Sequence, residues 1–131
     1  MNAEIKALWL EKLRDPETKQ TRGALNRTIQ DDRGGLCCLG VLCELAADAG
    51  VVERAYRMGV DRVGYRTVRY PKSGAVDVEY GVLPREVQEW AGLDSPSPKV
   101  EVRGQGVLLL STENDKGRTF AEIADMIEVG L

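Results

Sequence analysis

The sequence contains no histidine, and its three cysteines, Cys37, Cys38 and Cys43, all lie in one short apolar run. Histidine is the side chain that most often works as an acid or base near neutral pH, so a nucleophile in this chain lacks its usual catalytic partner. Three clustered cysteines also leave a tetrahedral zinc ion without a fourth ligand. We therefore expect no catalytic residue, no metal site and no cofactor, and we predict that the protein is not an enzyme.

Several other motifs and charge patterns are absent. The sequence has no P-loop, no Gly-x-Ser-x-Gly elbow and no His-Glu-x-x-His helix, which argues against the chemistries that those motifs support. Its 18 basic and 21 acidic residues give a net charge of −3, without the basic surface of a protein that binds duplex nucleic acid. The apolar run 36–45 is too short to span a bilayer, and the first residues lack a signal-peptide layout. We expect a cytoplasmic protein that binds neither nucleic acid duplexes nor membranes.

Two helices are predicted in the first half of the chain. Residues 3–14 have apolar side chains on one helical face; Asn2 can cap the start, and Asp15-Pro16 ends the pattern. The apolar residues 38–49 predict a buried helix that Gly50 stops. Gly40 inside this helix lowers its intrinsic stability, which indicates close packing at that point.

The second half predicts two further helices and two hairpins. Leu83-Pro84 opens a helix that Gly92 closes, and Thr119 forms a capping box with Glu122 at the start of the last helix. Segments rich in valine and tyrosine, separated by turn residues, predict the hairpins at residues 60–70 with 75–80 and 99–103 with 107–111. The predicted core includes Trp9, Leu39, Leu42, Cys43, Ile123 and Ile127.

These elements predict a single α+β domain over residues 1–131. Three to four helices are expected to pack on a small antiparallel sheet built from the two hairpins. The length suits one domain with one hydrophobic core.

Four segments resemble a family of small uncharacterised bacteriophage and prophage proteins. They are an amphipathic Trp-Leu helix at 3–14, Cys-Cys-Leu-Gly-Val-Leu-Cys-Glu-Leu-Ala, Leu-Pro-x-x-Val-x-x-Trp-x-Gly-Leu, and Asn-Asp-x-Gly-x-Thr-Phe-x-Glu-Ile-Ala-Asp-x-Ile at 114–127. A leucine usually precedes the Asn-Asp pair of the tail, where this chain has Glu113. The resemblance implies a viral accessory protein that acts in the cytoplasm of a host bacterium, a class that includes inhibitors of host defence.

The cysteines have two possible roles. A thiol at a helix N-terminus has a lowered pKa and can become a reactive thiolate, and Cys37 and Cys38 come at the predicted start of a helix. Buried cysteines in an apolar run instead behave as small hydrophobic residues. The absence of histidine favours the second role.

Two polar segments carry the candidate ligand-binding residues. One is the long connection 16–35, and the other, 113–119, precedes the last helix, whose N-terminal N–H groups favour anions. Each segment has a structural alternative: the first can be a solvated loop, and the second a turn in which Asn114 or Asp115 bonds its own backbone and Gly117 takes a positive φ. If the two segments share a face, the candidate ligand-binding residues are Lys19, Arg22, Arg27, Asn114, Lys116, Arg118 and Thr119.

Two functions follow from these features. In the first, the protein is a non-catalytic binder of a small anionic, nucleotide-like ligand, and by the resemblance it sequesters a signal of host defence. In the second, it is an inhibitor or adaptor that docks on a host protein, and a homo-oligomer is also possible. The candidate docking surface is acidic, with two aromatic anchors, and comprises Glu79, Glu86, Glu89, Asp94, Glu101, Tyr80 and Trp90.

Overall fold

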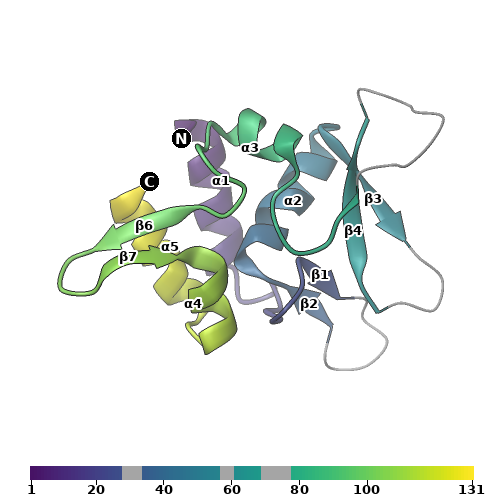
Figure 1. Ribbon diagram of the computed structural model, residues 1–131. Coiled ribbons are helices and arrows are strands. Elements are labelled where there is room, and N and C mark those ends of the chain that lie inside the picture. Colours follow the sequence, from purple (N-terminus) through teal and green to yellow (C-terminus); the bar gives the residue numbers. More distant parts are fainter. Residues whose placement is uncertain (28–33, 57–60, 69–77) are drawn as a thin grey trace.

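The computed structural model describes residues 1–27, 34–56, 61–68 and 78–131, and these form five helices and seven short strands of an α+β fold (Figure 1). The helices are α1 (Ala3–Arg14), α2 (Cys38–Asp48), α3 (Arg85–Ala91), α4 (Leu110–Lys116) and α5 (Phe120–Gly130). The strands are β1 (Asn26–Arg27), β2 (Gly35–Leu36), β3 (Val52–Tyr56), β4 (Val63–Thr67), β5 (Val78–Glu79), β6 (Lys99–Val102) and β7 (Gly106–Leu109).

Helix α2 lies at the centre of the fold. It is apolar around most of its circumference, which is the pattern of a helix buried on several sides. It contacts α1, α3 and α4, and also β2 and β3. Figure 1 shows α2 between the helices and the sheet of β3 and β4. The cysteine-bearing segment is therefore the core of the protein, as its composition predicted.

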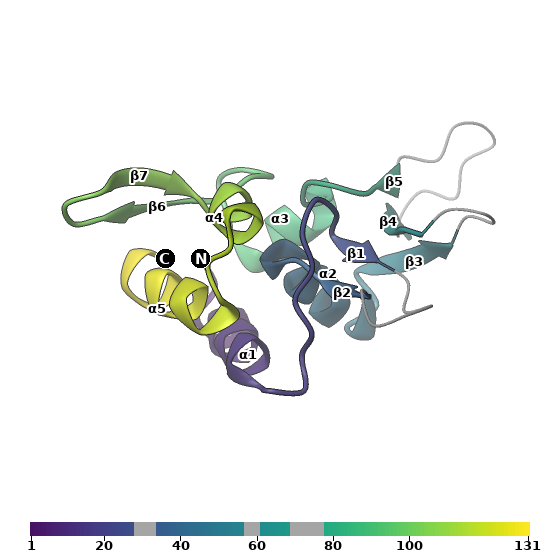
Figure 2. The ribbon, with the colours of Figure 1, turned by 90° about the horizontal axis from the view of Figure 1, so that it is seen from below.

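The predicted caps and core residues are confirmed. Asn2 accepts hydrogen bonds from the N–H groups of Glu4 and Ile5, and Thr119 and Glu122 form the reciprocal capping box of α5. Helix α5 packs against α1, which in turn packs against α2 (Figure 2). All six predicted core residues are completely buried: Trp9, Leu39, Leu42, Cys43, Ile123 and Ile127.

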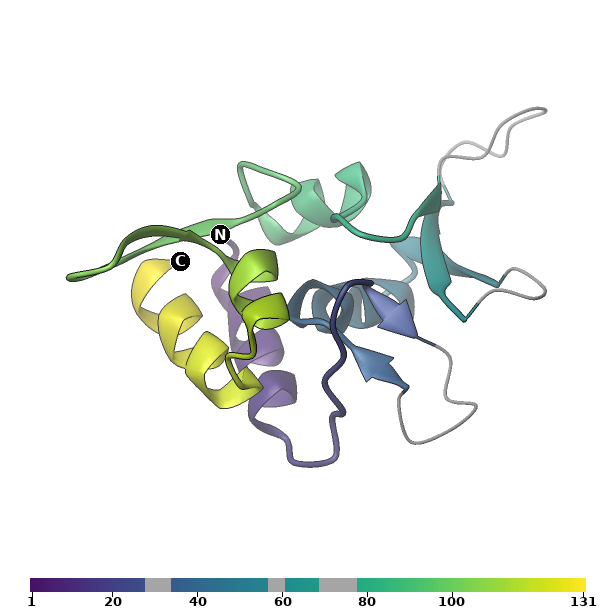
Figure 3. The same cartoon turned by 60° about the horizontal axis from the view of Figure 1, so that its bottom comes forward.

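The strands differ from the prediction in their arrangement. Instead of one sheet, the described strands form three separate antiparallel sheets, β1–β2, β3–β4–β5 and β6–β7 (Figure 3). Strand β3, which the sequence analysis did not predict, pairs with β4 along its whole length. The predicted pairing of 60–70 with 75–80 is present as β4 with β5, and the turn between them lies outside the described residues.

Helix α4 was not predicted, so the helix count is five rather than three to four. Its sequence, LSTENDK, has no apolar periodicity, because the helix buries polar side chains as well as Leu110. It takes residues 110 and 111 out of the predicted second hairpin, which is otherwise present as β6–β7. It ends at Gly117, whose φ of 109° confirms the predicted positive φ.

Gly40 marks the closest approach between α2 and the preceding segment. A Cβ atom on Gly40 would lie 1.8 Å from the carbonyl oxygen of Leu25, a separation that no side chain can occupy. The Leu25 carbonyl also accepts a hydrogen bond of 3.1 Å from the N–H of Cys37. The predicted close packing is confirmed, and it fixes the segment that leads into β1 against the start of α2.

Candidate functional site

The two segments predicted to carry ligand-binding residues lie in direct contact. The Nε2 of Gln20 donates to the Arg118 carbonyl at 2.8 Å, and the Gly23 N–H donates to the Asp115 carboxylate at 3.0 Å. The Arg22 guanidinium lies 3.1 Å from the position that a Cβ on Gly117 would take. Segments almost one hundred residues apart in sequence therefore share one face.

Asn114 joins these segments from a completely buried position. Its Oδ1 accepts hydrogen bonds from Gln20 Nε2 at 2.8 Å and from the Cys38 N–H at 3.2 Å. Its Nδ2 donates to the Thr21 carbonyl at 2.8 Å. The side chain is thus used by the protein itself, and it bonds distant segments rather than the backbone of its own turn. Its place in the fold is structural.

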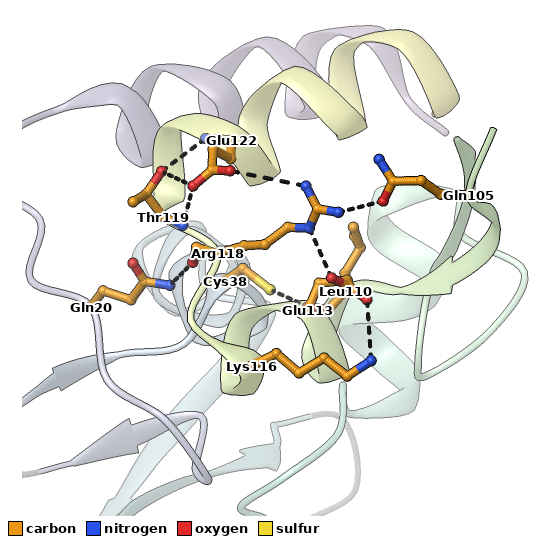
Figure 4. A network of polar contacts seen from close by, with 9 residues as sticks. All are labelled: Gln20, Cys38, Gln105, Leu110, Glu113, Lys116, Arg118, Thr119 and Glu122. Carbon is orange, nitrogen blue, oxygen red and sulfur yellow. Dashed lines mark hydrogen bonds and ion pairs between the residues drawn. The ribbon is translucent and has the colours of Figure 1, made fainter. Parts of the chain in front are cut away.

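Arg118 and Lys116 are directed toward acidic side chains rather than left free (Figure 4). The Nε of Arg118 lies 2.8 Å from a carboxylate oxygen of Glu113, whose side chain is only 8% exposed. Arg118 also contacts Glu122 and Gln105, and the Lys116 ammonium lies 3.8 Å from Glu113. Glu113, the position where the resembling family usually has leucine, therefore pairs with both predicted cations.

Of the remaining predicted residues, two have structural roles and two are exposed to solvent. Arg27 pairs with Asp61 at 2.8 Å, and Thr119 caps α5. Arg22 is exposed and has no ion-pair partner within the described residues. Lys19 is also exposed and lines a cleft.

This cleft, with a volume of about 380 Å³, lies between α1, residues 17–19, β2 and α2. Its apolar part consists of Leu36, Val41 and Leu45, and its rim carries Lys12 and Lys19. Neither lysine has an ion-pair partner in the described part of the chain. A volume of this size lies within the range of sites for small ligands, which typically combine apolar walls with a few polar groups. The full lining is Lys12, Glu17, Thr18, Lys19, Gly35, Leu36, Val41, Glu44, Leu45 and Asp48.

The acidic wall of the cleft is held by Arg54 on β3. The Nε of Arg54 lies 2.8 Å from Glu44, and another guanidinium nitrogen lies 2.9 Å from Asp48. These carboxylates raise the pKa of Arg54. The guanidinium offsets one of these two negative charges, and Glu17 is a further carboxylate that lines the cleft.

Of the cleft residues, Lys19 was predicted from the sequence, whereas Lys12 and Glu44 were not. Lys12 lies in the polar face of an amphipathic helix, where lysine is ordinary. Glu44 did have a signal, because it is the one charged residue within the apolar run 36–46. A charge in such a run is costly to bury unless it is paired, so it indicates a specific partner.

The three cysteines are buried, and none forms a disulfide. Burial raises the pKa of Cys37 to about 11, and it raises the pKa of Cys38 and Cys43 as well. Cys37 is the N-cap of α2 and accepts from the Gly40 N–H at 3.4 Å, but desolvation exceeds this effect. Burial therefore favours the second role, in which the cysteines pack as hydrophobic residues.

The acidic residues proposed for docking do not form one surface. Glu86, Glu89 and Trp90 line a second cleft of about 360 Å³ together with residues 50, 51 and 68. Glu79 lies on β5 and Glu101 on β6, and these strands are at opposite ends of the molecule in Figure 2.

No metal site and no membrane-spanning helix are found in the described part of the chain. Among the described residues, no three His, Cys, Asp or Glu side chains are grouped closely enough to hold a metal ion. The described helices are all too short or too polar to cross a membrane.

The fold and the cleft define a small α+β protein with a partly apolar, mixed-charge cleft beside its central helix. The chain matches the family described as "Domain of unknown function (DUF8296)" over residues 1–131, and it belongs to that family. No curated protein and no solved structure matches the chain.

Proposed function

We propose that the protein is a non-catalytic binder of a small anionic, nucleotide-like ligand, and that the ligand binds in the cleft between α1 and α2. The observation that carries this proposal is the pair of lysines, Lys12 and Lys19, unpaired within the described residues beside an apolar wall. Ammonium groups bind phosphate as mobile point charges, and Leu36, Val41 and Leu45 offer a surface for a ring. A role without catalysis agrees with the lack of histidine and with the raised pKa values of the thiols.

The proposed cleft is not the pocket that was expected between the two polar segments. Those segments use their polar atoms on each other, and two of their cations are paired with Glu113. Of the seven predicted residues, Lys19 alone lines this cleft. By the resemblance to phage proteins, the biological role would be the sequestration of a signalling nucleotide of host defence.

The test is a thermal-shift screen of nucleoside mono-, di- and cyclic phosphates, followed by titration calorimetry of the strongest compound. A ligand that binds only the folded state raises the melting temperature. Lys12→Ala and Lys19→Ala should each weaken binding about tenfold or more, the effect of one lost charge-assisted hydrogen bond. Higher salt should weaken it further.

Lys116→Ala is the matched control, because Lys116 is an exposed lysine on the polar segment that carried the original prediction. If Lys116→Ala binds the ligand as tightly as the wild type while Lys12→Ala and Lys19→Ala bind it more weakly, the result supports binding in the cleft. If only Lys116→Ala loses affinity, the ligand binds at the segment before α5 instead. No stabilisation by any phosphate in the screen would contradict the proposed function.

The second candidate is docking on a host protein. It is favoured by the cleft of Glu86, Glu89 and Trp90, which a half-buried tryptophan lines together with two glutamates. Aromatic residues of this kind are common energetic centres of interfaces. A basic host protein whose binding is lost in Trp90→Ala but kept in Lys19→Ala would favour this candidate over the ligand-binding one.

A further inference from the structure

Glu44 is fixed at the wall of the cleft by two donors that use the same oxygen. Its Oε2 accepts from Arg54 Nε at 2.8 Å and from the Tyr65 hydroxyl at 2.9 Å. Arg54 is itself held by Asp48 at 2.9 Å. Donors from two neighbouring strands therefore set the position of a carboxylate on the central helix.

The direction of the Tyr65 hydrogen bond is also fixed. Tyr65 is completely buried, and Asn26 Nδ2 donates to its hydroxyl oxygen at 3.0 Å. Burial and the nearby Glu44 raise the pKa of Tyr65, so its hydroxyl stays protonated at physiological pH. Because Asn26 already supplies one hydrogen to this oxygen, the hydroxyl hydrogen is free to go to Glu44. Glu44 is thus held as an acceptor.

The other carboxylate oxygen of Glu44, Oε1, remains available. A carboxylate oxygen offers about two acceptor positions, and Arg54 and Tyr65 occupy those of Oε2. Oε1 has no hydrogen-bond partner within the described residues, although the Glu44 side chain is only 29% exposed and lines the cleft. A ligand in the cleft therefore meets an acceptor that is already oriented and partly desolvated.

We propose that Glu44 selects nucleotides whose base carries an exocyclic amino group, with the phosphate at Lys12 and Lys19 and the amino group donating to Glu44 Oε1. This inference rests on the proposed function of the cleft. Since only one oxygen is available, a single amino donor fits it better than a base edge that needs both carboxylate oxygens. A base that presents only acceptors there leaves the carboxylate without a partner and is disfavoured.

The experiment compares matched ligands by titration calorimetry on the full chain. Adenosine 5′-monophosphate and cytidine 5′-monophosphate are each paired with the analogue that lacks the exocyclic amino group. We expect at least one amino nucleotide to bind about tenfold or more tightly than its analogue, the effect of one charge-assisted hydrogen bond. In Glu44→Gln, whose amide can present N–H groups to the cleft, this preference should disappear. Glu53→Gln is the control, because Glu53 is also paired with an arginine, Arg66, but does not line the cleft.

The outcomes separate this inference from the proposed function. If the wild-type protein binds amino and des-amino nucleotides equally well, and Lys19→Ala binds both more weakly, the role of Glu44 is overturned but the binding site is retained. Failure of all four nucleotides to bind at millimolar concentration overturns the role of Glu44, and failure of every phosphate in the thermal-shift screen overturns the proposed function as well. The wild-type comparison decides the matter even if Glu44→Gln does not fold. For that variant, an unchanged melting temperature without ligand shows that any lost preference is not caused by unfolding.

Discussion

At the scale of single residues, Asn114 is the side chain on which the arrangement of the polar segments most depends. It is completely buried and satisfies the N–H of Cys38 and the carbonyl of Thr21, groups that belong to segments distant in sequence. Removing the amide leaves both backbone groups buried without partners. A buried unsatisfied group costs about 1–3 kcal/mol.

Asn114→Ala should therefore lower the free energy of unfolding by about 2–5 kcal/mol, measured by equilibrium urea denaturation. Thr112→Ala is the control, because Thr112 is an exposed residue of the same helix and no hydrogen bond of its side chain is found in the described residues. That variant should stay within about 0.5 kcal/mol of the wild type. If both variants have equal stability, Asn114 does not hold the two segments together.

The buried thiols give the protein a pH dependence with a defined sign. Burial disfavours the thiolate of Cys37 and raises its pKa from about 9 in the unfolded chain to about 11 in the folded protein. Between these values the unfolded chain binds fewer protons than the folded one, so stability falls as pH rises. We expect the contribution of Cys37 to the free energy of unfolding to be fully present below about pH 9 and lost by about pH 11.

The measurement is the free energy of unfolding from pH 8 to 11 for the wild type and for Cys37→Ser, which keeps a cap acceptor and removes the thiol. The slope of the wild type should be steeper by up to about 1.4 kcal/mol per pH unit above pH 9. Parallel pH profiles would contradict the buried, protonated state of Cys37.

At the scale of secondary structure elements, the contact between α2 and the segment before β1 is the tightest point identified. Gly40→Ala should destabilise the protein by about 1–3 kcal/mol, although alanine is the better helix former. The cause is the Leu25 carbonyl, which occupies the place of the new Cβ. Circular dichroism with thermal unfolding measures the effect.

Gly81→Ala is the matched substitution, because an added Cβ there meets nothing within 4 Å. It should leave the melting temperature nearly unchanged. A stabilised Gly40→Ala protein would mean that α2 does not approach the chain at Leu25.

The elements that the sequence analysis predicted correctly are those whose signals are local. Helices α1 and α5 have a periodic apolar face and a polar cap within a few residues, and the glycine-containing turn of β6–β7 lies between its strands. Helix α4 lacks such a face, because besides Leu110 it buries Asn114 and Glu113, which bond Gln20, Cys38, Thr21 and Arg118 outside the helix. Sequence spacing does not show partnerships of this kind.

The candidate site was predicted only in part for the same reason. Lys19 was identified as a cation in a long polar connection, but its neighbours Lys12 and Glu44 come from two separate helices. Arg118 was predicted to bind a ligand, yet Glu113 of the preceding turn already neutralises it. Charge composition shows how many cations are present, and only the packing shows which of them lack a partner.

At the scale of the whole molecule, the proposed function places a small phosphorylated ligand in the cleft between α1 and α2. The cleft combines an apolar wall, two lysines unpaired within the described residues, and a carboxylate held in place from β3 and β4. Its volume of about 380 Å³ is close to the lower limit of sites that bind small molecules. These features favour a nucleotide over a large or purely apolar ligand.

The most direct test is a titration of the isotope-labelled protein with adenosine or cytidine 5′-monophosphate, followed by amide chemical shifts. We predict shifts that concentrate at residues 17–19, 35–36 and 41–48, the segments that line the cleft. Residues 114–119 should change little, because their polar groups are already bonded within the protein. Shifts centred on 114–119, or no shifts at millimolar nucleotide, would contradict the account.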